Sequence, residues 1–291
     1  MQQKRNYAYR TIGFIGTGNM GAALAAAAAK AESESARTAA FFLSNRSRRK
    51  AEALAQRMAA DSANVSVSSN REIAQSCDLL FLGVKPKNLP ELFEEIGPIL
   101  RERLLSDPEK AFTLVTMAAG VSCDEIRSLA GVDRSGLSCP VIRIMPNTPA
   151  AVGAGVIQFC GQGVSEEAFA AFTALLRPAG ALIPLPEDLM DAAAAVSGCG
   201  PAFVYLFIEA MADGGVACGL PRDMALKFAA ETAAGAAKMV LETARHPGEL
   251  KDAVCSPGGT TIQGVRALEA GGLRSAVTEA VIAAYEKSKK A

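Results

Sequence analysis

The stretch TIGFIGTGNMG, residues 11–21, decides how this chain folds. A short apolar run leads into a GxGxxG turn, and an alanine-rich segment with helical character follows the turn. In such a turn Gly16 makes the tight bend, Gly18 lets the backbone approach a pyrophosphate, and Gly21 lets the helix pack on the strand. The side chains that line the turn are those of Thr17, Asn19 and Met20. A glycine-rich turn without a ligand is the alternative, but the order of strand, turn and helix favours dinucleotide binding.

The same alternation of short apolar runs and amphipathic segments continues well past the middle of the chain. Strands are predicted at residues 12–15, 41–43, 65–67, 78–84, 112–117, 141–145, 156–160 and 182–185. Helices are predicted between them at residues 22–30, 48–59, 70–75, 89–100, 123–129 and 166–176. Because helices join successive strands, we predict an α/β fold with a doubly wound parallel sheet.

After the last predicted strand, the chain reads as helix only. Helices are predicted at residues 188–195, 202–218, 222–244, 246–254 and 261–285, and Gly214-Gly215 is a candidate break in the second of them. We therefore divide the chain into a nucleotide-binding domain, residues 1–183, and a helical domain, residues 184–291. The helices carry more apolar surface than five helices bury in a monomer, which predicts an oligomer interface in this domain.

Charge and hydropathy exclude several classes of partner. The 30 basic and 30 acidic side chains balance, and no basic run interleaves with aromatic residues, so we predict no binding to nucleic acid or to anionic membranes. No stretch reaches the roughly 20 apolar residues of a membrane span. Residues 1–10 form a short leader without the apolar core of a signal peptide. These features predict a cytoplasmic protein.

The cysteines also indicate a cytoplasmic protein. The chain has one histidine and seven cysteines, none of them in a CxxC pair: Cys77, Cys123, Cys139, Cys160, Cys199, Cys218 and Cys255. This irregular spacing is typical of reduced thiols in a reducing compartment. It predicts no metal site, because zinc sites usually draw on closely spaced cysteine or histidine pairs.

The end of the second strand indicates which nicotinamide cofactor is bound. An NAD enzyme usually places a carboxylate there to bind the adenosine ribose. This chain has Ser44, Asn45 and Arg46 instead, which can hold and pair with a 2′-phosphate. The segment therefore favours NADPH, with NADH as the weaker alternative. A basic first turn of a solvated helix, continued by residues 48–50, is the other interpretation.

Two further strand ends are expected to face the nicotinamide half of the cofactor, because ligands of open parallel sheets lie beyond the carboxyl ends of the strands. The residues concerned are Gly83, Val84, Lys85, Pro86, Ala118 and Ala119. For Lys85 the sequence leaves two roles open, contact with a phosphate or ribose and an ordinary surface position before a proline.

The helical region contains two turns rich in small residues, SGCGPA at 197–202 and SPGGTT at 256–261, and each opens a predicted helix. The amides and hydroxyls of Gly258, Gly259, Thr260 and Thr261 could receive the carboxylate of a small ligand at a helix N-terminus. A helix start with a glycine turn and no ligand is the alternative interpretation.

Six motifs occur in one order: FIGTGNMG at 14–21, SNR at 44–46, GVKP at 83–86, PNTP at 146–149, SGCGPA at 197–202 and LKDAVCSPGGTT at 250–261. By these motifs the chain resembles the pyrroline-5-carboxylate reductases from Thr11 to about Lys287. The resemblance implies NAD(P)H-dependent reduction of 1-pyrroline-5-carboxylate to L-proline, the last step of proline synthesis. It also implies a Rossmann domain, a helical dimerisation domain, and homodimers that often assemble into decamers.

The resemblance also assigns individual residues. It implies that Asn70 binds the cofactor and that Glu187, Thr260 and Thr261 surround the substrate, with Thr260 or Thr261 able to bond the ring nitrogen. Two positions depart from the usual pattern. Cys199 stands where a serine is common, and Cys255 stands where a hydroxyl residue is common. A thiol is a poor hydrogen-bond donor, so Cys199 fits if the position requires only a small side chain.

The expected chemistry needs few catalytic groups. A protonated imine requires a hydride but no strong general acid. The resemblance makes Thr260 and Thr261 the candidate catalytic residues, and His246 is expected to be a surface or capping residue. A 3-hydroxyacid dehydrogenase is the enzyme alternative, but it needs a basic side chain, and residues 203–218 contain no lysine. An NADP-binding sensor is the non-catalytic alternative, against which the intact SPGGTT turn argues.

Overall fold

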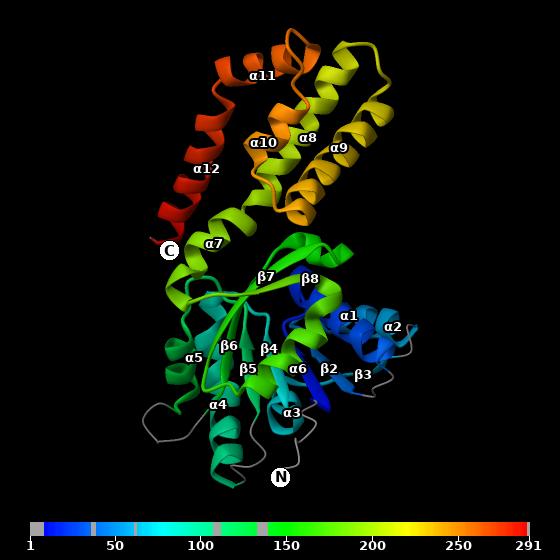
Figure 1. Cartoon of the computed structure of the whole chain (residues 1–291). Coiled ribbons are helices and arrows are strands. Elements are labelled where there is room, and N and C mark those ends of the chain that lie inside the picture. Colours follow the sequence, from blue (N-terminus) through cyan, green and yellow to red (C-terminus); the bar gives the residue numbers. More distant parts are fainter. Residues whose placement is uncertain (1–8, 36–38, 61–62, 107–111, 133–138, 290–291) are drawn as a thin grey trace, which may run out of the picture. The chain divides into compact units, whose positions relative to one another are not determined.

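The computed structural model describes residues 9–35, 39–60, 63–106, 112–132 and 139–289 (Figure 1). It divides into two compact units. The first extends to Gly198, and the second comprises Cys199–Lys287.

The first unit is built on an eight-stranded sheet with the strand order β3-β2-β1-β4-β5-β6-β7-β8. The strands are β1 (Thr11–Ile15), β2 (Ala40–Ser44), β3 (Asn64–Val67), β4 (Leu79–Leu82), β5 (Thr113–Thr116), β6 (Val141–Pro146), β7 (Gly155–Gln162) and β8 (Gly180–Pro184). Neighbouring strands are parallel except β6 and β7, which are antiparallel. The connection between these two is a single 3-10 turn, η2 (Thr148–Val152), ending at Gly153 with φ of 75°. A link this short reverses the chain, whereas a parallel pair needs a longer crossover.

Helices cover both faces of the sheet, as the doubly wound prediction requires (Figure 1). They are α1 (Asn19–Glu34), α2 (Arg48–Ala60), α3 (Asn70–Ser76), α4 (Leu89–Ser106), α5 (Cys123–Ala130) and α6 (Glu166–Leu176). One buried cluster contains Phe14, Phe81 and Phe172, and a second, on the other face, contains Ile15, Leu80 and Leu82. The central strands are therefore buried on both sides, which explains their continuous apolar sequence.

The division between the units falls later in the chain than the expected boundary after residue 183. The 3-10 turn η4 (Glu187–Leu189) and helix α7 (Met190–Ser197) follow β8 and remain part of the first unit. Polar contacts attach these two elements to the sheet, because Arg143 on β6 bonds to Glu187 in η4 and to Asp191 in α7. Hydropathy alone does not report such bonds.

The second unit consists of α8 (Gly200–Ala217), α9 (Arg222–Thr243), α10 (Pro247–Ala253), α11 (Thr260–Ala270) and α12 (Leu273–Ser288). The candidate break in the first of these helices is absent, and the prediction of a single last helix was wrong. Helix α8 continues through Gly214-Gly215. A Cβ on Gly215 would lie 3.1 Å from the Ala225 Cβ, so this glycine allows close packing of α8 on α9. The single helix expected at 261–285 is two helices, separated at Gly271-Gly272, where Gly272 has a φ of 74°.

The described residues of the second unit bury only three side chains, those of Ala212, Ala225 and Ala229. Tyr205, Leu206 and Phe228 are among the large apolar residues left exposed. By length and composition alone, Glu187–Ala217 could cross a membrane, contrary to the expectation that no stretch would. However, this segment comprises η4, α7 and α8, and its first two elements are bonded to the sheet of the first unit. Its apolar surface is consistent with the predicted oligomer interface.

Candidate active site

The glycines of the first βα turn fit a close approach of two backbones. Gly16 has a φ of 96°, and a Cβ there would lie 2.7 Å from the carbonyl carbon of Gly83. A Cβ on Gly83 or Gly21 would lie 2.3 or 2.4 Å from the Gly16 oxygen. Gly18 differs, because a Cβ there would meet nothing within 4 Å. Three glycines are therefore required by the protein's own packing, and Gly18 faces the open space where a pyrophosphate would lie.

The N-terminus of α1 provides the anion-binding end of this turn. Its N-cap is Gly18, which has no side chain, and the first turn contains no acidic residue. The first amides, at Asn19 and Met20, and the helix dipole are thus available to phosphate oxygens. Thr17 is buried, and its Oγ1 accepts a hydrogen bond from Asn45 Nδ2 at 3.1 Å. This bond fixes the end of β2 beside the turn.

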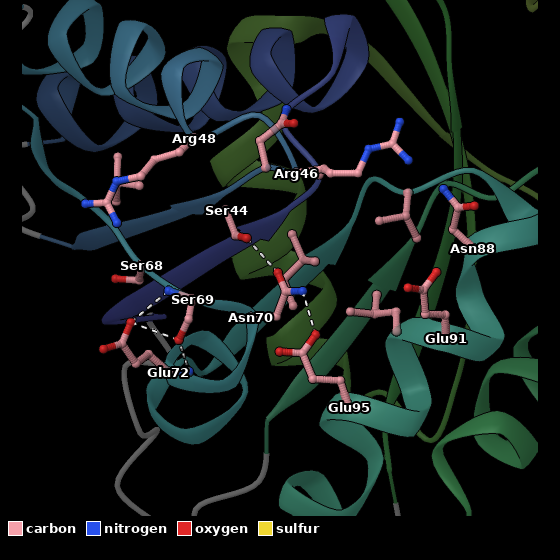
Figure 2. Close-up of a pocket in the computed structure, with 16 residues that line it drawn as sticks. Ser44, Arg46, Arg48, Ser68, Ser69, Asn70, Glu72, Asn88, Glu91 and Glu95 are labelled. Carbon is pink, nitrogen blue, oxygen red and sulfur yellow. Dashed lines mark hydrogen bonds between the residues drawn. The ribbon is translucent and has the colours of Figure 1, made fainter.

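A pocket of about 820 Å³ lies at the carboxyl edge of the sheet (Figure 2). The predicted cofactor residues that line it are Gly16, Ser44, Asn45, Arg46, Asn70 and Val84. The predicted residues that lie outside its lining are Thr17, Gly18, Asn19, Met20, Gly83, Lys85, Pro86, Ala118 and Ala119. The pocket therefore collects the residues expected around the adenosine ribose, Ser44, Asn45 and Arg46, together with Val84, which was expected at the nicotinamide half.

Asn70 is the centre of a polar network in this pocket (Figure 2). Its Oδ1 accepts a hydrogen bond from Ser44 Oγ at 2.6 Å, and its Nδ2 donates one to Glu95 Oε2 at 2.8 Å. Glu95 was not among the predicted residues. It lies on α4 one turn after Glu91, which also lines the pocket. The four-residue spacing places both side chains on one face of the helix, and this was the signal in the sequence that could have identified Glu95.

The two arginines of the pocket differ in their partners. Arg48 donates from Nε to Glu52 Oε1 at 2.9 Å along the first turns of α2. Arg46 is exposed at the edge of the pocket and forms no ion pair within the part of the chain that the structure describes. Glu72 also lines the pocket, but its carboxylate binds the Ser69 amide and hydroxyl, and these bonds lower its pKa. Arg46 is thus the cation available to a phosphate.

The two remaining strand ends lie on the same edge of the sheet. Lys85 is exposed and precedes η1 (Pro86–Asn88). Strand β4 ends at Leu82, two residues earlier than the predicted strand, so Pro86 begins η1 and does not itself end the strand. After β5, Ala118 is buried and its amide donates to Thr116 Oγ1 at 3.3 Å, whereas Ala119 is exposed. These segments follow β4, which neighbours β1, and β5, the next strand beyond it, where the nicotinamide half is expected.

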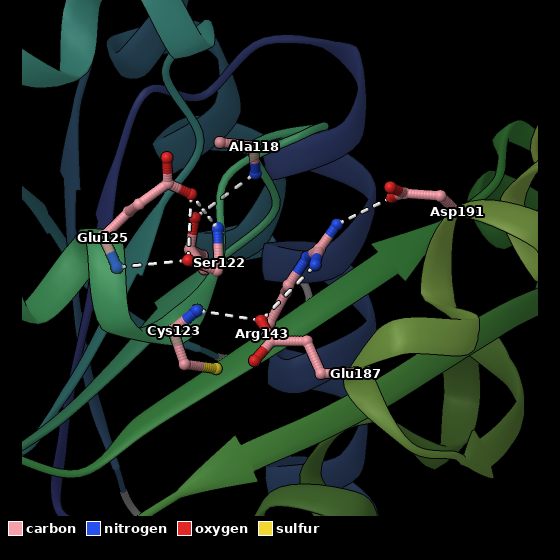
Figure 3. A network of polar contacts seen from close by, with 8 residues as sticks. Ala118, Ser122, Cys123, Glu125, Arg143, Glu187 and Asp191 are labelled. Atoms are coloured by element: carbon pink, nitrogen blue, oxygen red, sulfur yellow. Dashed lines mark hydrogen bonds and ion pairs between the residues drawn. The ribbon is translucent and has the colours of Figure 1, made fainter. Parts of the chain in front are cut away.

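Glu187 belongs to an ion-pair network inside the first unit (Figure 3). Its Oε1 accepts hydrogen bonds from the Cys123 amide at 2.8 Å and from Arg143 Nη1 at 3.3 Å. The other arm of the guanidinium, Nη2, bonds to Asp191 Oδ1 at 2.9 Å. Arg143 is buried, and the sequence offered a signal for it, since it is the only charged residue in the apolar strand VIRIMP.

The turns PNTP and SGCGPA meet in a second polar network. Asn147 Nδ2 donates to the Ser197 carbonyl at 2.9 Å, and Asn147 Oδ1 accepts from the Val156 amide at 2.8 Å. Gln158 Nε2 donates to Ser197 Oγ, while Gln158 Oε1 is buried without a partner among the described residues. Asn147 and Gln158 therefore hold the end of α7 against the sheet.

The SPGGTT turn lies in the second unit and opens α11. Gly258 has a φ of 68°, and a Cβ on Gly259 would lie 2.3 Å from Ser256 Oγ. Gly259 is the N-cap, so no side chain covers the first amides, and Thr260 and Thr261 are exposed. This is an open helix N-terminus suited to a carboxylate. Glu187 and these residues belong to different units.

His246 and Cys199 both lie at helix starts. His246 caps α10, and its Nδ1 accepts from the Gly248 amide at 3.1 Å, which confirms the capping role predicted for it. Cys199 is the exposed N-cap of α8 and makes no side-chain capping bond. Its position requires no hydrogen bond within the unit.

The structure also brings together groups that the sequence separates. Cys123, Cys160 and Glu187 place their ligand atoms within 4.8 Å of one another, although no metal site was predicted. The hydrogen bond to Cys160, together with burial, raises the pKa of the Cys123 thiol, and the same bond lowers the pKa of Cys160. No signal in the sequence indicated this cluster, because its residues lie on three different elements.

Two family models match the chain and define its class. Residues 11–108 match a model described as NADP oxidoreductase, coenzyme F420-dependent. Residues 187–291 match a model described as pyrroline-5-carboxylate reductase dimerisation. With the Rossmann-type sheet and the open dinucleotide turn, these matches define an oxidoreductase that binds NAD(P)H and carries a helical dimerisation domain.

Relatives along the whole length identify the particular family. The chain is 40% identical to pyrroline-5-carboxylate reductase of Glycine max, covering 96% of this chain and 95% of the relative. It is 40% identical to that of Escherichia coli K12, covering 97% and 98%. The structure of the Plasmodium falciparum pyrroline carboxylate reductase with NADP bound has a TM-score of 0.78 at 32% identity, covering 96% and 97%. The Coxiella burnetii enzyme has a TM-score of 0.81 at 28% identity, covering 98% of each chain. The chain belongs to the pyrroline-5-carboxylate reductase family.

Proposed function

We propose that this chain transfers a hydride from NADPH to the C=N bond of 1-pyrroline-5-carboxylate and releases L-proline. The observation that carries the proposal is the open N-terminus of α11 at Gly258-Gly259-Thr260-Thr261, in a chain whose other unit carries a dinucleotide turn. The first feature suits a small carboxylate and the second suits a pyrophosphate.

The substrate is a small ring with one carboxylate and one imine nitrogen. In the proposed complex Gly258, Gly259 and the first turn of α11 surround the carboxylate, because the first amides of the helix have no partner within it and the dipole is positive there. The Gly259 amide itself is bonded to the Ser256 carbonyl at 3.0 Å, so the donors are those of the first turn. The exposed hydroxyls of Thr260 and Thr261 supply the remaining contacts, one of them to the ring nitrogen. The resemblance also assigns Glu187 to the substrate.

The bound cofactor supplies the hydride, and the protein supplies position. A protonated imine already carries the proton that the product amine keeps, so no strong general acid is required. The described helix α8 contains no lysine, which a dehydrogenase acting on a hydroxyacid would need as a base. We therefore propose direct hydride transfer without a covalent intermediate, in which the residues of the turn bind and orient the ring.

The preference for NADPH is part of the proposal. Arg46 is unpaired among the described residues and stands beside Ser44 and Asn45 at the end of β2, where an NAD enzyme usually has a carboxylate. Lys85 at the end of β4 is the second candidate contact to phosphate or ribose. NADH remains the alternative cofactor.

We further propose a homodimer that can assemble into a decamer and functions in the cytoplasm. Support for the dimer comes from the exposed apolar residues of α8 and α9. Support for the compartment comes from the seven cysteines, all of which are free in the structure. Light scattering on the purified full-length chain measures the size of the assembly.

The activity test uses purified protein, NADPH and DL-1-pyrroline-5-carboxylate, with the nicotinamide absorbance followed and the product identified. We expect L-proline, with NADH as a slower donor and negligible oxidation of 3-hydroxyacids in the reverse direction. Oxidation of hydroxyacids without proline formation would overturn the substrate assignment. NADPH binding without any turnover would favour the sensor alternative.

A further inference from the structure

Three ligand-type side chains converge in the first unit, outside the nucleotide pocket. They are Cys123 at the start of α5, Cys160 on β7 and Glu187 in η4. The two sulfur atoms and a carboxylate oxygen all lie within 4.8 Å of one another. We propose that these three groups bind a borderline-soft divalent cation, for which Zn²⁺ is the probe, with one coordination position left open.

The separations suit a tetrahedral ion. Zinc binds thiolate sulfur at about 2.3 Å and carboxylate oxygen at about 2.0–2.2 Å, so two ligand atoms on one ion lie roughly 3.5–3.8 Å apart. The 4.8 Å limit on the observed separations is about 1 Å above that range. Two sulfur ligands favour zinc over magnesium or calcium, which prefer oxygen.

The backbone around each ligand is held firmly. Ser122 caps α5 through a reciprocal bond with Glu125, and this fixes the position of Cys123. Cys160 lies directly opposite Arg143 in the antiparallel pair of β6 and β7, so both side chains project from the same face. The site is therefore supported by regular secondary structure, which limits the ordering required on binding.

Arg143 would be the second-layer group of this site. It donates to Glu187 Oε1 at 3.3 Å, which orients the carboxylate and leaves the other oxygen with lone pairs to offer. Two thiolates and a carboxylate around a divalent ion leave one negative charge, which the buried Arg143 guanidinium partly offsets while it also pairs with Asp191. Outer partners of this kind orient ligands in known metal sites.

An ion can reach the group. Cys123 is buried, but Cys160 and Glu187 are only half-buried, so the cluster is open on the side of the carboxylate. Both thiols must lose their protons to bind, and affinity should therefore rise with pH. The inference does not depend on the reductase activity, because binding is measured without substrate or cofactor.

The experiment titrates the full-length, reduced, metal-free protein with Co²⁺ and then with Zn²⁺ in competition with a chromophoric chelator. We expect one ion per chain, thiolate-to-cobalt charge-transfer absorption and the visible bands of a tetrahedral site. Cys123→Ala and Cys160→Ala should abolish the charge-transfer bands and weaken Zn²⁺ binding more than about 100-fold. Glu187→Gln should keep the thiolate bands and weaken binding by about 10-fold.

Matched controls separate this site from other thiols. Cys139→Ala removes another buried thiol of the first unit and should bind Zn²⁺ as the wild type does. A protein with the exposed Cys199 and Cys218 replaced by serine should also bind normally. Loss of binding in this double variant, or wild-type binding by Cys160→Ala, would overturn the proposal in favour of adventitious surface binding.

Two more outcomes decide the case. If Cys123→Ala fails to fold, as judged by circular dichroism and thermal unfolding, Cys160→Ala and Glu187→Gln carry the test. If the reduced protein binds no ion, but peroxide joins Cys123 to Cys160 with loss of two hydrogens by mass, the cation site is overturned. In that case the two thiols are oxidised to a disulfide, and the peroxide is reduced to water.

Discussion

The two units of this chain bury their apolar residues in different ways. The first unit has two clusters on opposite faces of its sheet, containing stacked aromatic rings and aliphatic side chains. The second has five helices and, among the described residues, three buried alanines, while tyrosine, leucine and phenylalanine side chains of α8 and α9 are exposed. The first unit is completed by its own packing. The second requires a partner surface, and its match to a dimerisation model is consistent with this requirement.

The largest expected effect tests whether the first unit is self-contained. Phe81 is fully buried and stacks on Phe14 with ring centroids 4.3 Å apart. Phe81→Ala should lower the free energy of unfolding of this unit by about 3–5 kcal/mol, because it removes aromatic contacts and leaves a cavity. Urea unfolding at several protein concentrations measures it. A loss that disappears at high protein concentration would show that the unit depends on association.

The next prediction tests the dependence of the second unit on a partner. Leu206 on α8 is 66% exposed, and Leu206→Glu should weaken the dimer by about 3 kcal/mol if this face is buried between two copies. Light scattering over a dilution series gives the result. Leu105→Glu is the matched control, since Leu105 is 70% exposed on α4 of the first unit. Equal association by both variants would place the interface elsewhere.

A smaller effect is expected at the open end of α11. Thr261→Ala and Thr260→Ala should each reduce kcat/KM by about 10- to 100-fold, because each removes a hydrogen bond to a charged group. The affinity for NADPH should not change. Steady-state kinetics and fluorescence titration of NADPH separate the two quantities. Thr278→Ala, a threonine of α12 that bonds the Arg274 carbonyl, is the control. If cofactor affinity falls with kcat/KM, the turn does not act on the substrate alone.

The preference for NADPH over NADH should fall by about the free energy of one charged contact. Arg46→Ala should raise the KM for NADPH by about 10-fold, which corresponds to about 1.4 kcal/mol, and change that for NADH little. Arg48→Ala is the matched control, because Arg48 is paired with Glu52 at 2.9 Å. Equal changes with both cofactors would contradict a role for Arg46 at a 2′-phosphate.

The smallest effect concerns the helix start beside the thiol cluster. Bonds from Ser122 lower the pKa of Glu125 below its ordinary value of 4.5. The ionised carboxylate therefore stabilises the fold above pH 4.5, and this contribution is lost as the pH falls through the folded pKa. Glu125→Gln should cost less than about 1 kcal/mol at neutral pH and nothing in strong acid. Glu102→Gln, at an exposed position of α4, should show no such pH dependence in urea unfolding.

Much of the first unit could be predicted because its signals are local. Apolar runs placed the strands, and Gly16, Gly18 and Gly21 placed the turn. The failures in the second unit are instructive. Gly214-Gly215 and Gly271-Gly272 are the same dipeptide, yet only the second ends a helix. The difference lies in the neighbour, since Gly215 packs on Ala225 while Gly272 adopts a positive φ.

By itself the sequence determined the α/β order, the dinucleotide turn, the helical dimerisation region and the open α11 start, because each depends on residues adjacent in the chain. Only the tertiary structure decided that Asn70 bonds to Glu95 and that Arg143 bonds to Glu187 and Asp191. It also decided that the ligand atoms of Cys123, Cys160 and Glu187 lie within 4.8 Å of one another. These contacts join separate elements. Hydrophobic periodicity specifies which face of an element is buried, but it does not specify which polar side chain of another element will lie opposite.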